Sequence, residues 1–98
     1  MALDIRHDRS AHRFEALVEG VLCELDYTLS DGSSPDAARV MAIDHTGVPA
    51  AVSGRGIAGE LVRAALTVAR TEGWSVVPAC SYAASWMARH PEFDDLRL

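Results

Sequence analysis

The feature that most constrains the fold is a change in the spacing of the hydrophobic residues near position 53. Before this position, apolar residues largely alternate with polar ones, as they do in strands that bury one face. After it, apolar residues recur at helical spacing as far as Gly73. Such a change predicts a sheet followed by a helix that packs on it, and therefore an α/β fold.

Four segments before position 53 are predicted to be strands. Residues 21–29 alternate most clearly, with apolar side chains on one face and mostly polar ones on the other. Residues 12–19 also alternate, although Leu17 interrupts the pattern, and residues 4–8 are a weaker candidate. Residues 39–46 are apolar on both faces, which is typical of a central strand.

The connections between these strands are short. Glu19-Gly20 separates two alternating segments and fits a tight hairpin turn. Residues 30–36 are the one linker-like stretch, and they are too short to separate two domains. We therefore expect a single domain over residues 1–98.

The second half predicts a helix, a short strand and another helix. The first helix runs from Ile57 to Gly73, where glycine can adopt a left-handed cap without a side-chain penalty. Residues 75–78 form a short buried strand, and a helix over residues 81–89 stops before Pro91. The order is β-β-β-β-α-β-α, in a mixed, mainly antiparallel sheet of about five strands with two helices. The crossover through the long helix makes the two flanking strands parallel.

Size and charge narrow the classes of function. A chain of 98 residues holds one core, and its formal net charge of -5 argues against a nucleic-acid partner. No apolar run is long enough to span a bilayer, so no membrane partner is expected. Residues 1–6 lack the charged segment followed by an apolar segment that is typical of a signal peptide, and this favours a cytoplasmic location. In a reducing cytoplasm, Cys23 and Cys80 are expected to be free thiols, and neither has the spacing of a metal site.

The segment Ser53-Gly54-Arg55-Gly56-Ile57-Ala58-Gly59 carries the chemistry, because it follows a strand and opens a helix. Glycines let the backbone approach a ligand closely. The first turn of a helix offers free N–H donors and the positive end of the helix dipole, so a pyrophosphate would fit there. Taken alone, the pattern also fits a merely tight connection. A nucleotide-hydrolysing P-loop is excluded because no Gly-Lys-Ser/Thr is present.

The residues around this turn resemble those of the GNAT superfamily of N-acetyltransferases, whose signature here is Gln/Arg-x-x-Gly-x-Gly/Ala. Gly56 and Ala58 match it, whereas Ser53 replaces its first residue. The chain is most similar to the compact, YjdJ-like subgroup, which shares four blocks in the same order. These blocks are His45-Thr46-Gly47-Val48-Pro49, Gly54-Arg55-Gly56-Ile57, Pro78-Ala79-Cys80 and His90-Pro91-Glu92-Phe93.

The resemblance implies an acetyl-CoA site and an amine acceptor. The backbone at Thr46, Gly47 and Val48 would contact the pantetheine arm. The turn from Ser53 through Gly54, Arg55, Gly56 and Ile57 to Ala58 would hold the pyrophosphate. The strands at 39–46 and 75–78 would part to admit the thioester, and Cys80 would face the acetyl group.

Three side chains are candidates for catalysis. Cys80 precedes a helix N-terminus, which favours a thiolate, although a free cysteine is also commonly a buried apolar residue. His45 could act as a base or simply pack near the cofactor, and Asp44 is expected on the opposite face. Tyr82 could protonate the departing thiolate or pack in the core with Trp86 and Phe93. Cys23 is expected to be buried.

Two departures from the relatives weaken the prediction of an enzyme. The subgroup has glutamate where this chain has Gly47, so a carboxylate that could orient an amine or act as a base is missing. Trp86 also stands where many relatives place a tyrosine that protonates the departing thiolate, and an indole cannot serve as that acid. The first hypothesis is acetyl transfer from acetyl-CoA to an amine. The alternatives are a CoA-binding regulatory module and an unrelated α/β domain with a structural glycine turn.

Overall fold

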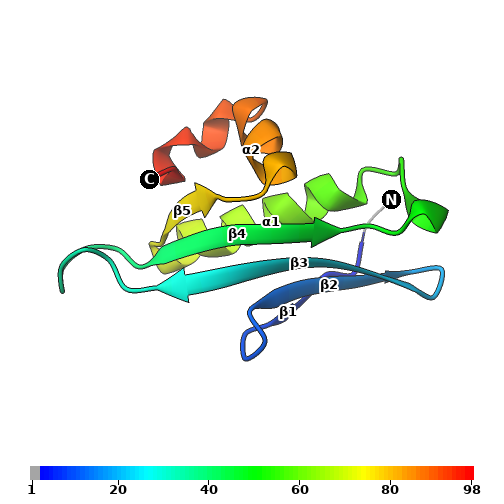
Figure 1. Cartoon of the computed structure of the whole chain (residues 1–98), viewed down its shortest axis with the longest axis horizontal. Coiled ribbons are helices and arrows are strands. Elements are labelled where there is room, and N and C mark those ends of the chain that lie inside the picture. Colours follow the sequence, from blue (N-terminus) through cyan, green and yellow to red (C-terminus); the bar gives the residue numbers. More distant parts are fainter. Residues whose placement is uncertain (1–2) are drawn as a thin grey trace.

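The computed structural model describes residues 3–98; residues 1–2, part of the segment searched for a signal peptide, lie outside it. The described chain forms one five-stranded sheet with two α-helices and two short 3-10 helices (Figure 1). The strands are β1 Arg6–Asp8, β2 Arg13–Val18, β3 Val21–Ser30, β4 Val40–Gly47 and β5 Ser75–Pro78. The helices are η1 Ala50–Val52, α1 Ile57–Glu72, α2 Ser81–Ala88 and η2 Pro91–Leu96.

The strands lie in the sheet in the order of the chain, β1-β2-β3-β4-β5. The first three pairs are antiparallel, and β4 and β5 are parallel. This arrangement confirms the predicted mixed sheet and the crossover through α1. The β2–β3 turn is also as predicted: Glu19 and Gly20 have φ angles of 52° and 77°, which a two-residue hairpin turn requires.

The core lies between α1 and one face of the sheet. The alternation in β2 and β3 places one set of side chains under α1, whose own apolar stripe faces them. Gly73 ends α1 in the left-handed conformation, as predicted (φ 75°). The fully buried side chains of this interface include Phe14, Cys23, Leu25, Met41, Ile43, Leu61, Val62 and Leu66.

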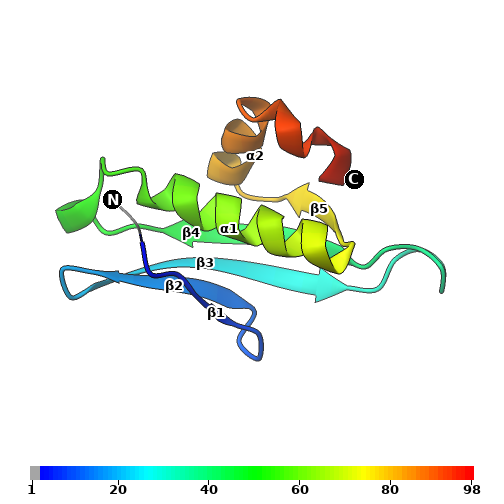
Figure 2. The same ribbon diagram turned by 180° about the vertical axis from the view of Figure 1, so that it is seen from behind.

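The opposite face of β2, β3 and β4 carries no helix among residues 3–98. In Figure 1 β4 lies in front of α1, and in Figure 2 α1 lies in front of β4. Val40 and Ala42, which point to the bare side, are only half-buried, whereas Met41 and Ile43 are fully buried. The apolar character of β4 on both faces therefore does not mean cover on both faces.

A β-bulge in β4 corrects the expectation for Asp44. The register shifts between Asp26 and Tyr27, so that Tyr27 pairs with Ile43 and Asp26 pairs with His45. Asp44 is thus the extra residue of β4, and its carboxylate accepts a hydrogen bond from Thr28. Since Thr28 and Asp26 share the bare face of β3, Asp44 lies on the same face as His45 rather than on the opposite one.

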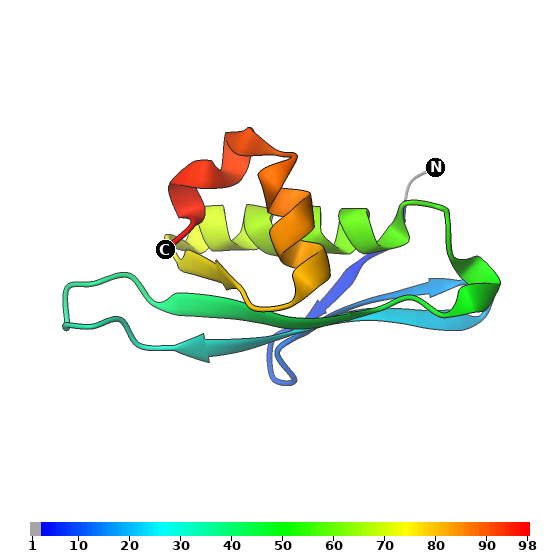
Figure 3. The same cartoon turned by 45° about the horizontal axis from the view of Figure 1, so that its top comes forward.

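The chain after β5 packs against α1 beside the edge of the sheet (Figure 3). Arg70 of α1 forms a two-pronged ion pair with Asp95 of η2, at 2.7 and 2.9 Å. The last residue, Leu98, donates its N–H to the Val76 carbonyl of β5 at 3.0 Å. The two 3-10 helices and this final pairing are not predicted from the sequence, because segments this short leave no periodic pattern.

No helix of the chain from residue 3 onward combines the length and apolar character that crossing a membrane requires.

Candidate functional site

The glycine turn between β4 and α1 has the backbone that an anion site needs. Gly54 and Gly56 have φ angles of 77° and 75°, which side-chain-bearing residues rarely adopt. Gly56 is the N-cap of α1, and no side chain of the described chain caps this helix end. The first N–H groups of α1 therefore remain available as donors, together with the positive end of its dipole.

A hollow of about 300 Å³ opens directly at this turn. Its walls come from the end of β4, the turn, the start of α1 and the first turn of α2. They are Val48, Ser53, Gly54, Gly56, Ile57, Ala58 and Tyr82. The structure thus brings together most of the residues that the sequence assigns to the cofactor, along with Tyr82.

Arg55 turns away from this hollow. Its guanidinium pairs with the Glu19 carboxylate at the tip of the β2–β3 hairpin. Both side chains are exposed, so the pair contributes little to stability and can exchange for another anion. The hairpin contact could not be predicted from the sequence, because nothing local relates positions 19 and 55.

The ladder between β4 and β5 stops before β4 ends. Its last pair is Ile43 with Pro78, after which the Cys80 N–H donates to the Ile43 carbonyl at 3.0 Å. Beyond that point β5 gives way to α2, and β4 continues alone on that side as far as Gly47. The β4 backbone from Asp44 onward is therefore open toward a ligand that enters from the hollow.

The two cysteines occupy different environments. Cys80 is the N-cap of α2, where its Sγ accepts the Ala83 N–H at 3.4 Å, and its side chain is partly exposed. Cys23 has no exposed surface, and burial raises the pKa of its thiol. The prediction of a buried Cys23 is confirmed.

Tyr82 approaches α1 over Gly59, the last residue of the glycine-rich segment. A Cβ at Gly59 would lie 2.9 Å from Trp86 Nε1 and 3.3 Å from the Tyr82 hydroxyl. Trp86 stacks on His90, with ring centroids 3.6 Å apart, and is nearly buried, which supports its packing role. The sequence places Gly59 in the glycine-rich segment but does not predict that Tyr82 and Trp86 pack over it.

His45 lies on the bare face of the sheet, on the far side from Tyr82. Donor atoms of His45, Glu24 and Asp26 lie within 4.8 Å of one another. Such a group could hold a cation, but Arg13 already fills that role. Its guanidinium lies 2.7 Å from Asp26 Oδ1 and 3.3 Å from Glu24 Oε2. No local spacing in the sequence relates Glu24 and Asp26 to His45, because only the pairing of β3 with β4 brings them together.

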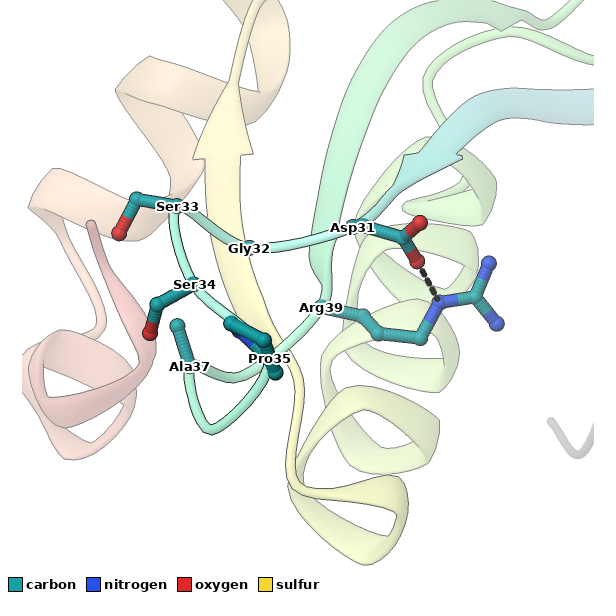
Figure 4. A pocket seen from close by; sticks show the side chains of 7 residues that line it. All are labelled: Asp31, Gly32, Ser33, Ser34, Pro35, Ala37 and Arg39. Carbon is teal, nitrogen blue, oxygen red and sulfur yellow. Dashed lines mark ion pairs between the residues drawn. The ribbon is translucent and has the colours of Figure 1, made fainter.

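A larger hollow, of about 560 Å³, lies at the other end of β4. It is formed by the β3–β4 loop, as Figure 4 shows, with Asp31 and Arg39 paired across it at 3.5 Å. Its walls are mostly exposed residues of one loop, and the strand ends that border it, Ser30 and Val40, pair with each other. We therefore place the candidate site at the smaller hollow, where backbone donors converge.

Comparison with known proteins points to one family. Residues 13–96 match the profile of a family described as GCN5-related N-acetyl-transferase. No curated protein sequence matches the chain. A GCN5-like protein from Staphylococcus aureus, solved by NMR, is similar in structure, with a TM-score of 0.72 and 24% identity over 98% of this chain and 88% of that one. The ribosomal-protein-alanine N-acetyltransferase from Brucella melitensis gives a TM-score of 0.62 and 22% identity, over 85% of this chain and 62% of that one.

Proposed function

We propose, since the chain belongs to the family of GCN5-related N-acetyltransferases, that it binds acetyl-CoA and transfers the acetyl group to an amine acceptor. One observation carries this proposal. The uncapped N-terminus of α1, the two left-handed glycines and the end of β4 line one hollow.

The pyrophosphate of acetyl-CoA binds at the turn from Ser53 to Ala58. Successive N–H groups at a helix N-terminus satisfy phosphate oxygens, and the helix dipole favours their negative charge. Arg55 adds a charged contact when it leaves Glu19. The pantetheine arm follows the open β4 backbone at Thr46, Gly47 and Val48, which leads the thioester toward the gap that opens beyond the last β4–β5 pair.

Acetyl transfer needs a neutral amine, a stabilised oxyanion and a proton for the departing thiolate. Backbone N–H groups near Gly47 and Val48 serve the oxyanion. Tyr82, whose side chain lines the hollow, is the proton donor to the thiolate. Cys80 flanks the acetyl group beyond the last β4–β5 pair, and His45 lies where an acceptor amine would approach from the bare face.

A second function is a CoA-binding regulatory module with little catalysis. Gly47 favours it, because a glycine at that position supplies no carboxylate to an amine. The two functions share the binding site and differ only in whether acetyl groups are transferred.

Calorimetry with acetyl-CoA and CoA, followed by an acceptor screen, tests the proposal. The screen holds free amino acids, polyamines, lysine peptides and a peptide with an N-terminal alanine, and product is detected by mass spectrometry. Binding with transfer to one amine class supports the enzyme. Binding without transfer across the panel supports the regulatory module, and no binding of either ligand contradicts both.

A further inference from the structure

The space above Gly47 is bordered by a carboxylate from the neighbouring strand. Glu24 of β3 is the register partner of Gly47, so the two residues share the bare face of the sheet. A Cβ built on Gly47 would lie 3.5 Å from Glu24 Cγ and 3.7 Å from its Oε1. The same Cβ would lie 3.1 Å from His45 Nε2. A small polar group placed there would therefore meet Glu24 and His45 together.

The bulge at Asp44 creates this arrangement. Between Ser30 and Tyr27, the pairing of β3 with β4 follows a register that would place Glu24 opposite Thr46. The extra residue moves the register by one position, so that Glu24 faces Gly47 instead. Gly47 has no side chain to fill the space, and its neighbour Val48 lines the hollow at the glycine turn.

Arg13 holds this carboxylate in a defined orientation. Its guanidinium approaches Glu24 Oε2 at 3.3 Å and leaves Oε1 on the side of Gly47. Asp26 accepts the Nε–H of the same guanidinium at 2.7 Å, which fixes Arg13 in turn. The side chain of Glu24 is 27% exposed, so a molecule on the bare face can reach it.

We propose that Glu24 is a catalytic residue that receives the acceptor amine, in place of the carboxylate that position 47 lacks. This inference rests on the proposed acetyl transfer and assigns the acceptor to the bare face of the sheet. The acceptor is a primary amine that arrives as an ammonium ion, because a carboxylate binds that form through a charge-assisted hydrogen bond.

Acetyl transfer begins when the acceptor loses a proton. The ammonium gives one proton to Glu24 Oε1, and the neutral nitrogen attacks the thioester carbonyl carbon to form the C–N bond. The C–S bond then breaks and CoA leaves as a thiolate. The thiolate takes its proton from the Tyr82 hydroxyl, and the second proton on the nitrogen restores that hydroxyl through water. Glu24 returns the first proton to water.

Glu24→Gln tests this assignment, with Glu15→Gln as the matched control. Glu15 lies on the same face, also faces Arg13 (3.8 Å) and pairs with Glu24, but it stands one strand farther from Gly47. We expect Glu24→Gln to lower kcat by about a hundredfold, within the range of general base catalysis, while the Kd for acetyl-CoA stays within twofold of the parent. Glu15→Gln should leave kcat within threefold.

A pH profile and a rescue separate catalysis from a structural effect. The remaining rate of Glu24→Gln should rise tenfold per pH unit, because the amine must then lose its proton to solvent before it reacts. Adding Gly47→Glu to the Glu24→Gln variant should raise its kcat at least tenfold, because the new carboxylate would enter the same space. A parental kcat in Glu24→Gln, equal losses in the two glutamine variants, or no rescue would each overturn the assignment. Absence of transfer by the parent would instead refute the proposed function.

Discussion

The two faces of the sheet differ in burial and in charge. The face under α1 is filled by apolar side chains without exposed surface, such as Leu25, Met41 and Leu66. The bare face carries Arg13, Glu24 and other charged side chains that are partly or fully exposed. Burial of apolar surface on the first face stabilises the fold, while the second face keeps its polar groups in contact with solvent.

Under the proposed function, the two faces of the sheet would have different parts in the transfer. A ligand seated at the start of α1 lies at one end of the covered face. Its reactive end reaches the bare face only where β4 runs on past β5, near Gly47. Without a helix over the bare face in the described chain, an acceptor can approach there directly.

Leucine substitutions on the two faces should differ most strongly in their effect on the free energy of unfolding. Leu66→Ala removes a fully buried side chain and should lower the free energy of unfolding by about 2–5 kcal/mol. Leu17→Ala, at a side chain 71% exposed on the bare face, should change it by less than about 0.5 kcal/mol. Urea unfolding measures both, and equal losses would break the distinction between the faces.

Gly56→Val should weaken acetyl-CoA binding at least tenfold, about 1.4 kcal/mol. A side chain there would stand in the turn where the pyrophosphate approaches. Gly73→Val is the matched control, because Gly73 has the same φ of 75° but lies at the far end of α1. Calorimetry on folded samples compares them, and a Gly56→Val variant that binds as well as Gly73→Val would show that the site is misplaced.

Much of this fold could be predicted from hydrophobic spacing, because each long element buries one face. The order of strands and helices along the chain, the hairpin at Glu19-Gly20 and the end of α1 at Gly73 all follow from local patterns. The bulge at Asp44 does not, since one extra residue leaves the composition of β4 unchanged. The position of Glu24 opposite Gly47 depends on that bulge. A resemblance confined to residues 45–93 also gives no information about a residue of β3.

Cys80 should react faster than Cys23 with an alkylating reagent, and saturating CoA should slow the reaction of Cys80. Cys23 is buried under α1, whereas Cys80 is partly exposed beside the open end of β4. Timed labelling with peptide mapping by mass spectrometry distinguishes the two thiols. The proposed path of the thioester would be wrong if Cys23 reacted first, or if CoA left the rate at Cys80 unchanged.

The smallest effect should be a pH dependence of stability from His7. Burial, with Arg9 nearby, lowers the pKa of His7 below its ordinary value of 6.5. The side chain stacks on Phe14 and hydrogen-bonds the Tyr27 hydroxyl at 2.8 Å. His7 binds a proton more readily in the unfolded chain than in the folded one. The free energy of unfolding should therefore not depend on His7 above pH 6.5, and it should fall as the pH drops below that value. His7→Gln should flatten this part of the urea-denaturation profile, and an unchanged slope would contradict the assignment.

An amide NMR titration with acetyl-CoA tests the central claim most directly, because it reports on every part of the molecule at once. The account predicts the largest shifts at the backbone N–H groups of Thr46, Gly47 and Val48 and of residues 54–58, with small changes in the loop of residues 31–39. Saturating shifts centred on that loop, or on the exposed pair Leu17 and Leu22, would contradict the proposed site.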